Sequence, residues 1–260
     1  MLRPELPLRT MKFELKANAK INWTLEVLGV RADGYHEIRS VILPVPLHDD
    51  VVLSPAADVV CEMDMPGVGQ AENLAYRAAI ALKDATGCAK GARIEITKRI
   101  PAGAGLGGGS SDAAAVLNGL NELWDLGLSR QKLCEIAARV GSDVPALVFG
   151  GAVLAEGRGE MVRRLPPEMA VACNVPRNMD DVVLHVPEIA VSTAAVYREF
   201  RPEDRGLGAN DLQPAAIRIH PAIALAIERL KRRGVQRVTM SGSGSALYGL
   251  RRRCNPSDLA

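Results

Sequence analysis

A glycine-rich segment in the middle of the sequence reads Pro101-Ala102-Gly103-Ala104-Gly105-Leu106-Gly107-Gly108-Gly109-Ser110-Ser111. Glycines tolerate backbone conformations in which consecutive N–H groups converge, and they leave no Cβ in the path of a phosphate. Alternating residues 92–97 predict a strand before this loop, and an apolar stripe predicts a helix from Ser111 to about Trp124 after it. Because a helix N-terminus attracts anions, strand, loop and helix together predict a phosphate cradle rather than a flexible linker.

Two familiar phosphate-binding motifs fit this loop poorly. Gly103, Gly105 and Gly108 match the dinucleotide pattern G-x-G-x-x-G, but the acidic residue expected after a second strand is missing, because Asp125 ends the predicted helix. A P-loop needs a lysine directly after its glycines, and this loop has none. A dinucleotide-binding oxidoreductase is therefore only a runner-up.

Length and charge narrow the class of protein. With 260 residues, 48% of them hydrophobic, the chain exceeds one small core, and a Gly/Arg/Pro-rich stretch predicts a boundary between domains 1–160 and 161–260. A net charge of +2 and 3% aromatic residues argue against nucleic-acid and membrane partners. No apolar run approaches about 20 residues, and residues 1–10 lack a signal-peptide pattern, so we expect a cytoplasmic protein, with Met11 as an alternative start.

Cysteine and histidine are too scattered to suggest a metal site. The five cysteines form no Cys-x-x-Cys pair, and the four histidines show no ligand spacing. We expect reduced, mostly buried thiols rather than disulfides or a zinc centre.

The N-terminal part predicts a hairpin. Residues 19–27 alternate between apolar and polar, which indicates a strand with one buried face and places Lys20 and Asn22 on the same side. Asp33-Gly34 is a hairpin turn signal, and a return strand begins at Tyr35. Residues 51–53 predict a separate short strand.

Capping residues predict where several helices begin. Asn73 and Ser129 fit the N-caps of helices that end near Asp84 and at Gly141, and Asp143 precedes a Pro-containing helical turn. Near the C-terminal end, residues 221–230 predict a helix and 235–240 a strand.

Together with two distant segments, the loop resembles the GHMP kinases, the superfamily of galactokinase, homoserine kinase and mevalonate kinase. Residues 16–22 resemble its N-terminal motif and residues 238–245 its C-terminal motif. Residues 31–36, 141–145 and 210–212 resemble the branch that phosphorylates a cytidyl diphosphate alcohol in the non-mevalonate route to isoprenoids. The resemblance runs from about Lys16 to Gly249.

This resemblance implies an α+β, two-domain GHMP kinase fold. An N-terminal mixed β/α domain would bind ATP and Mg2+, and a C-terminal ferredoxin-like α/β sandwich would bind the small-molecule substrate. Either Ser110 or Ser111 would touch the metal, and the residues leave that choice open. The oligomeric state is left open too.

The resemblance also implies roles for single residues. Asp143 would orient the substrate hydroxyl and take its proton, and Lys20 would keep Asp143 charged and stabilise the transferring phosphoryl group. From the residues alone, a helix N-cap explains Asp143 and a solvated strand lysine explains Lys20.

The implied substrate carries a cytosine, a diphosphate and a branched tetrol. Its binding residues would be Tyr35 and Tyr197 as stacking partners of the cytosine, His36 as its hydrogen-bond partner, and Asn22 and Thr193 on the substrate side. Asn73 would lie near the adenine of ATP. Hairpin packing is the alternative explanation for Tyr35 and His36, and an N-cap is the alternative for Asn73.

Two further readings stay within the superfamily. The chain could phosphorylate another small alcohol, such as homoserine or a mevalonate-type acid, although those kinases lack the Tyr-His pair. It could also be a non-catalytic nucleotide-binding homologue. The family usually continues with a helix and a strand after the C-terminal motif, whereas this sequence ends soon after Leu250. We therefore expect a shortened second domain whose sheet edge is exposed or covered by other parts or copies.

Overall fold

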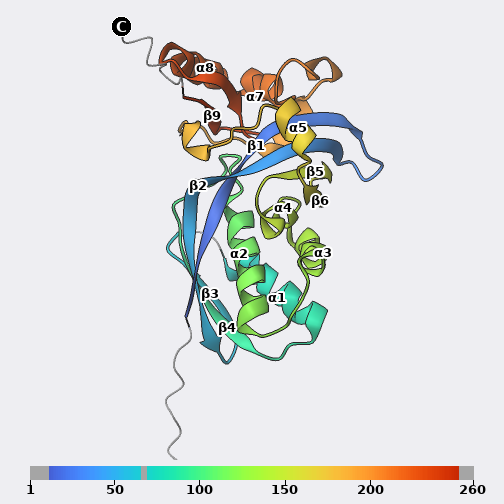
Figure 1. Ribbon diagram of the computed structural model, residues 1–260, viewed down its shortest axis with the longest axis vertical. Helices are drawn as coiled ribbons and strands as arrows, with labels where there is room; N and C mark the ends of the chain where they lie inside the picture. The colour runs from blue at the N-terminus through green and yellow to red at the C-terminus, as the bar shows by residue number, and fades with distance from the viewer. Residues whose placement is uncertain (1–11, 66–68, 252–260) are drawn as a thin grey trace, which may run out of the picture.

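A long β-hairpin forms the frame of the protein. The computed structural model describes residues 12–65 and 69–251. Strands β1 (Phe13–Val30) and β2 (His36–Ala56) run antiparallel along most of the molecule (Figure 1). The larger sheet has the order β3-β4-β2-β5-β6, with β1 paired to β2. Its other strands are β3 (Val59–Met63), β4 (Gly91–Thr97), β5 (Val153–Gly157) and β6 (Met161–Arg164).

Strand β2 corrects one expectation from the sequence. Residues 51–53 do not form a separate strand but continue β2, because Val51 and Leu53 are fully buried and pair with both β1 and β4. The hairpin register shifts between Asn18 and Lys20 and again between Asn22 and Thr24. Such bulges re-aim side chains and are common beside active sites.

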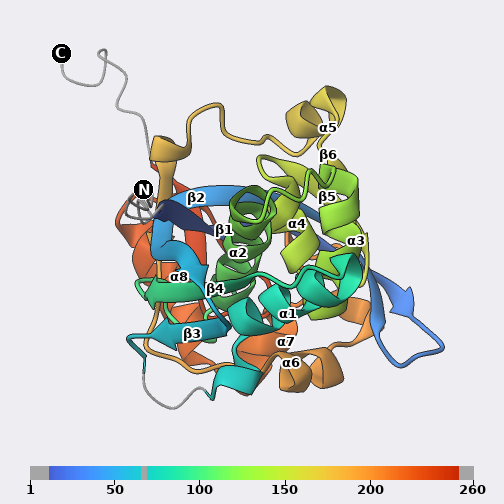
Figure 2. The same cartoon turned by 90° about the horizontal axis from the view of Figure 1, so that it is seen from below.

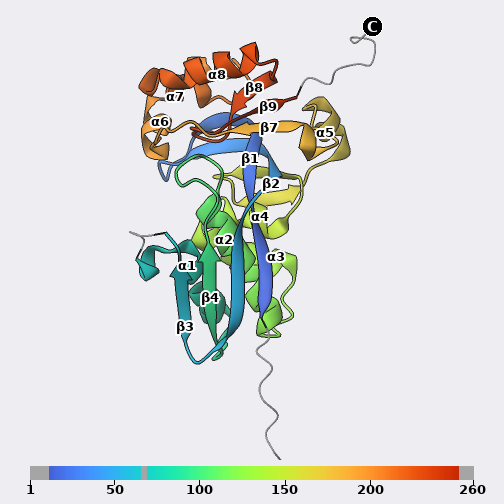
Figure 3. The same ribbon diagram turned by 90° about the vertical axis from the view of Figure 1, so that its left-hand side faces the viewer.

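Helices cover one face of the larger sheet (Figure 3). They are α1 (Leu74–Thr86), α2 (Gly108–Leu123), α3 (Arg130–Val140) and α4 (Val144–Phe149). Seen from below, α2 lies centrally, between the sheet and the other helices of this layer (Figure 2). Its apolar side and those of α1 and α3 share one core with the inner faces of β2 and β4.

The helix starts mostly confirm the capping signals. The side chain of Asn73 accepts a hydrogen bond from the amide of Ala75 (2.8 Å), and that of Ser129 accepts one from the amide of Lys132 (3.2 Å). The sequence predicts that this helix starts at Ser111, but α2 begins at Gly108. The difference arises because Gly107 takes left-handed dihedrals (φ 70°, ψ 25°) and turns the loop into the helix three residues earlier.

A smaller sheet and its helices form the upper part of the molecule. Its strands follow the order β7-β9-β8, and α7 and α8 cover the face turned away from the β1–β2 hairpin (Figure 3). The bounds are α5 (Pro167–Ala172), β7 (Val182–His185), α6 (Thr193–Glu199), α7 (Gln213–Ile219), α8 (Ala222–Arg232), β8 (Gln236–Met240) and β9 (Leu247–Leu250). Three short 3-10 helices span 70–72, 179–181 and 202–204. The helix and strand expected within 221–240 are therefore present.

The two parts share strand β1. The Leu25 amide donates to the Ala209 carbonyl (2.8 Å), and the carboxylate of Asp211 accepts from the amide of Val27 (2.8 Å). The side-chain Nδ2 of Asn210 donates to the carbonyls of Met240 (2.7 Å) and Gly242 (2.8 Å). The 210–212 motif thus connects β1 to the segment after β8. The domain boundary at residue 160 remains a prediction, and β6 just beyond it pairs with β5 in the larger sheet.

Within the described ranges, every helix is too short or too polar to cross a lipid bilayer.

The crowding of the glycine loop leads to a stability prediction. Gly103 and Gly105 both have positive φ, but a Cβ on Gly105 would lie 2.3 Å from the Ser241 carbonyl oxygen, whereas one on Gly103 meets no atom within 4 Å. We expect Gly103→Ala to lower the free energy of unfolding by about 1 kcal/mol, the cost of left-handed backbone alone. Gly105→Ala should lower it clearly further, because a backbone atom cannot yield cheaply.

Urea denaturation of the two variants measures this difference. Equal losses would show that the loop does not pack against residues 241–244 as described.

Candidate active site

One cavity collects nearly all of the residues that the sequence singles out. It has a volume of about 1000 Å³ and lies where the glycine loop, β1, α4, α6 and the segment after β8 meet. Its lining includes Lys20, Asp143 and the loop from Pro101 to Ser110. It also includes Asn22, Tyr35, His36, Asn73, Thr193 and Tyr197. Segments more than 200 residues apart in the sequence therefore line one space.

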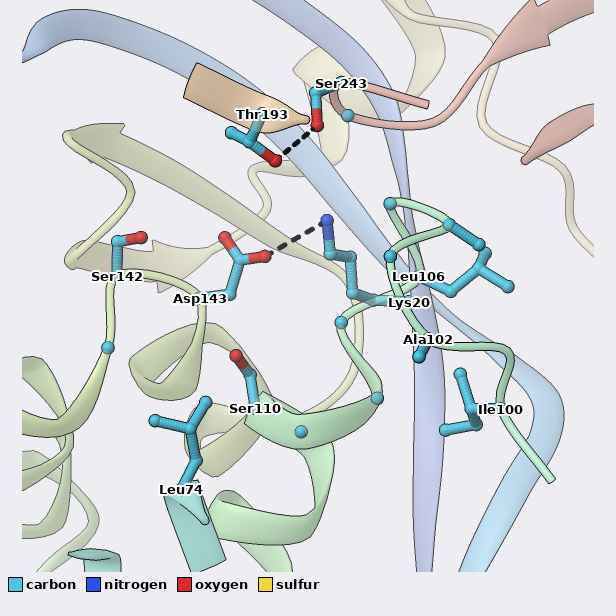
Figure 4. A pocket seen from close by; sticks show the side chains of 18 of the residues that line it. Lys20, Leu74, Ile100, Ala102, Leu106, Ser110, Ser142, Asp143, Thr193 and Ser243 are labelled. Carbon is cyan, nitrogen blue, oxygen red and sulfur yellow. Dashed lines mark hydrogen bonds and ion pairs between the residues drawn. The ribbon is translucent and has the colours of Figure 1, made fainter. Parts of the chain in front are cut away.

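Ser111 is the exception among the predicted loop residues. It is 2% exposed, and its hydroxyl bonds to the carbonyls of Asn18 (2.8 Å) and Gly107 (2.9 Å). Ser110 lines the cavity, with its hydroxyl on the same side as Lys20 and Asp143 (Figure 4). The structure thus separates two serines that the sequence leaves equivalent.

Lys20 reaches the centre of the cavity from β1 (Figure 4). The residue is only 3% exposed, and its Nζ donates to Asn22 Oδ1 (2.6 Å) and lies 3.2 Å from Asp143 Oδ2. A buried ammonium needs such partners, because its desolvation is costly. This geometry confirms that Lys20 and Asn22 share one side of the strand, and it contradicts the solvated-lysine alternative.

Asp143 stands at the N-cap position of α4 without capping it. Its backbone is in the αR region (φ −84°, ψ −17°), and its side chain makes no capping hydrogen bond. The carboxylate instead faces Lys20 and is 34% exposed on the cavity side. The N-cap explanation of this aspartate is therefore wrong, and the carboxylate is accessible to a bound molecule.

The glycine loop is held by hydrogen bonds on two sides. The amide of Lys20 donates to the Leu106 carbonyl (3.0 Å), and that of Ala246 donates to the Ala104 carbonyl (2.9 Å). The hydroxyl of Ser241 donates to the Gly105 carbonyl (2.9 Å). Three carbonyls of the loop are thus engaged by other segments, and the first, unpaired amides of α2 stand at its end.

Gly107 makes room for the lysine. A Cβ at this position would lie 3.0 Å from Cε and 3.1 Å from Cγ of Lys20. The glycine therefore serves the side chain of Lys20 as well as the conformation of the loop.

Aromatic residues gather at the other end of the cavity. The rings of His36 and Tyr197 lie 4.8 Å apart, tilted by 33°, and Tyr35 is 57% exposed. Burial, helped by the charge of Arg205, lowers the pKa of His36 below its usual 6.5, so its ring is mostly neutral near pH 7. A neutral imidazole can both donate and accept hydrogen bonds. Thr193 is nearby and shares a hydrogen bond with the Ser243 hydroxyl (2.8 Å).

Sequence reasoning missed a buried charged cluster beneath the loop. The ammonium of Lys98 bonds to the carboxylates of Asp49 and Asp112, the latter at 2.6 Å. Asp49 also accepts hydrogen bonds from the amides of Arg99 and Ile100, which fixes the entry of the loop. Asp112 directly follows the two serines of the loop, but a local pattern could not reveal that it meets Lys98, which directly follows β4, and, through this lysine, Asp49 on β2.

Asp112 carries an unusual proton affinity. Burial raises its pKa from 3.8 to about 7, and the charge of Lys98 opposes this rise only in part. Its Oδ1 is buried without a hydrogen-bond partner among the described residues.

In residues 12–65 and 69–251, thiols and possible metal ligands form no second candidate centre. Cys61, Cys88, Cys134 and Cys173 are free and partly buried, in agreement with the expected reduced thiols, and Cys254 lies outside the described residues. In the described ranges, no cluster of three His, Cys, Asp or Glu residues could hold a metal ion.

Comparison with known proteins gives one consistent answer. The model of the GHMP kinases N terminal domain matches residues 73–151, and that of the GHMP kinases C terminal region matches residues 193–253. A 4-diphosphocytidyl-2-C-methyl-D-erythritol kinase of Symbiobacterium thermophilum is 41% identical, over 91% of this chain and 90% of its own length. One from a Geobacillus species is 39% identical, over 92% and 88%.

Solved structures agree. A crystal structure of 4-(cytidine 5'-diphospho)-2C-methyl-D-erythritol kinase, 37% identical, matches with a TM-score of 0.76 over 92% of this chain and 90% of that one. A homoserine kinase from Cytophaga hutchinsonii, 17% identical, matches over 95% of this chain and 87% of that one with a TM-score of 0.62. At this identity the match shows the shared fold alone.

The pKa of Asp112 predicts a pH dependence of stability. Between about pH 4 and 7 the native state retains a proton that the unfolded chain has already released, so the contribution of Asp112 to stability falls as pH rises through this window. We expect the free energy of unfolding of Asp112→Asn to increase relative to that of the wild type as pH rises from about 4 to 7. Above about pH 7 the difference between the two proteins should stay constant. Urea denaturation at several pH values measures this gain.

The control is Asp84→Asn, a change at an exposed aspartate. Its free energy of unfolding should depend on pH in the same way as that of the wild type. A constant difference between Asp112→Asn and the wild type would contradict the raised pKa.

Proposed function

This chain belongs to the GHMP kinases, in the branch of the 4-diphosphocytidyl-2-C-methyl-D-erythritol kinases, and on that premise we propose how its own residues perform the transfer. The enzyme moves the γ-phosphoryl group of ATP to a hydroxyl of the tetrol, a step of the non-mevalonate isoprenoid pathway. The observation that carries our assignment is the Lys20–Asp143 contact at 3.2 Å, beside the glycine loop and inside the shared cavity.

The glycine loop binds the triphosphate. Its amides and the N-terminus of α2 supply donors and a positive dipole end, and the absence of side chains lets the phosphates approach. Asn73 and Leu74 line the cavity at the start of α1, which suits the adenine end of the nucleotide. The loop is held on both sides before ATP arrives, so little ordering is needed on binding.

Asp143 and Lys20 act on the reacting groups. Phosphoryl transfer depends mainly on positioning and on neutralising charge. The accessible carboxylate of Asp143 orients the tetrol hydroxyl and accepts its proton as the oxygen attacks the γ-phosphorus, while the bond to ADP breaks. The ammonium of Lys20 pairs with that carboxylate and lies where the transferring oxygens gain charge.

Mg2+ fits the oxygen-rich side of this site. The cation prefers hard oxygen ligands, takes several of them from water and from the phosphates of its nucleotide, and can add a serine hydroxyl that lies beside those phosphates. Ser110 is the serine of the loop that lines the cavity, whereas the hydroxyl of Ser111 is engaged by two carbonyls. When bound, the ion neutralises phosphate charge, and Ser110 is the residue that we expect to contact it.

The aromatic end supports a pyrimidine base as the remote handle. Tyr35 and Tyr197 offer ring faces, and the neutral imidazole of His36 offers a hydrogen-bonding edge. Asn22 is bonded to Lys20, and Thr193 lies on α6 with Tyr197, so we assign both residues to the tetrol side of the substrate. A kinase for homoserine or a mevalonate-type acid would have no use for these rings.

A coupled assay of ADP release tests the substrate. We expect turnover with 4-diphosphocytidyl-2-C-methyl-D-erythritol and at least about 100-fold lower kcat/KM with homoserine or mevalonate, because neither fills the aromatic end. CMP should compete with the tetrol substrate. Comparable turnover of homoserine, or no effect of CMP, would contradict the assignment.

Variants of the reacting pair test the mechanism. We expect Lys20→Ala and Asp143→Ala each to lower kcat by at least about 100-fold, because each removes a charge from the transition state. The matched control is Lys16→Ala, which removes an exposed lysine from the same strand and should keep full activity. Circular dichroism and thermal melting check that all three fold, and unchanged kcat in a folded Asp143→Ala would refute the proposed role.

A further inference from the structure

The turn between β5 and β6 lies near Asp143 and also near Tyr35 at the aromatic end of the cavity. Gly159 in this turn has φ 114°, and a Cβ there would lie 3.4 Å from the Ser142 carbonyl oxygen and 3.8 Å from Asp143 Oδ1. Its neighbour Arg158 places its guanidinium carbon 5.0 Å from the ring centroid of Tyr35. This short turn therefore lies beside Ser142 and Asp143, and it also places Arg158 against the ring of Tyr35.

The backbone of this turn is well held, whereas the guanidinium is not. The amide of Arg158 donates to Glu160 Oε2 (2.6 Å). Among the described residues, the nearest carboxylate oxygen to the side chain is Glu160 Oε1, 3.8 Å from Nε, which is too long for a hydrogen bond. The arginine lines the cavity with its forked set of donors still available.

Of the other three Lys and Arg residues that line the cavity, both lysines are engaged by protein partners. Lys98 is enclosed by two buried carboxylates beneath the loop, and Lys20 is held by Asn22 and Asp143. Arg198 lines the cavity from α6 and is exposed. Of these four residues, Arg158 is the one whose turn contacts the environments of both Asp143 and Tyr35.

We propose that Arg158 binds the diphosphate of the substrate, with its guanidinium resting on the Tyr35 ring. This inference rests on the proposed function, because that substrate carries two phosphates between its base and its reacting alcohol. A planar guanidinium donates two parallel hydrogen bonds to phosphate oxygens and stacks on an aromatic face at the same time. Held in this way, the diphosphate fixes the distance between the base and the hydroxyl that meets Asp143.

Binding of cytidine and CDP tests the proposal directly. Calorimetry is performed with a non-hydrolysable ATP analogue filling the nucleotide site. For Arg158→Gln we expect CDP binding to weaken at least about 10-fold and cytidine binding to change less than about 2-fold, because only CDP carries the phosphates. Arg158→Lys should lie between the wild type and the glutamine variant, since it keeps the charge but loses the fork.

Kinetics give an independent readout. We expect Arg158→Gln to raise KM for the tetrol substrate at least about 10-fold, with kcat and KM for ATP changed less than about 3-fold. The matched control is Arg163→Gln in the same hairpin, where the side chain pairs with Glu156 outside the cavity and should have no effect.

Two results would overturn the inference. Equal loss of cytidine and CDP binding in a folded Arg158→Gln would make the residue a stacking partner of Tyr35 only. Loss of CDP binding in Arg198→Gln with none in Arg158→Gln would place the phosphates on the other wall. Failure of the wild type to phosphorylate the tetrol would instead refute the proposed function, and CDP binding would still test Arg158.

Discussion

The site depends on one ion pair, that of Lys20 with Asp143. The Lys20 residue is only 3% exposed, so its ammonium loses most of its hydration, and the contact with Asp143 offsets part of that cost. Much of the surrounding structure serves this contact. Two register shifts in the hairpin flank the lysine, and Gly107 leaves space for its stem. Helix α4 presents the aspartate without using it as a cap.

The two buried lysines of the cavity have different environments, which is why we propose a role in the reaction for Lys20 and a structural role for Lys98. Lys98 bonds to two carboxylates that are themselves almost fully buried, so its charge is neutralised within the protein. Lys20 has one neutral amide partner and one carboxylate that is 34% exposed. Its charge therefore remains effective toward a ligand, while Lys98 fixes the entry of the loop.

The same cavity also separates a common chemistry from a particular substrate. The glycine loop, the ion pair and Ser110 are the parts that any ATP-dependent kinase of alcohols could use. In our proposal the rings of Tyr35, His36 and Tyr197 bind a planar base, and Arg158, beside Tyr35, binds the diphosphate. The residues that we propose for the reaction lie on β1, in the loop and directly before α4, whereas those that we propose for the base and the diphosphate come from the hairpin turn, the start of β2, the β5–β6 turn and α6. Substrate choice can thus change without disturbing the reacting pair.

Local sequence patterns were enough to predict the anion loop, the strand that pairs Lys20 with Asn22, and the caps at Asn73 and Ser129, because each depends on neighbours within a few residues. Similarity to the GHMP kinases pointed to Asp143 and to its pairing with Lys20, and the folded chain decided between that pairing and a cap of α4, which the residues alone left open. The continuity of β2, the enclosure of Lys98 and the place of Arg158 beside Tyr35 were likewise invisible in the sequence. Each of these arises where segments far apart in the chain pack together, and no local periodicity records which distant surface a side chain will meet.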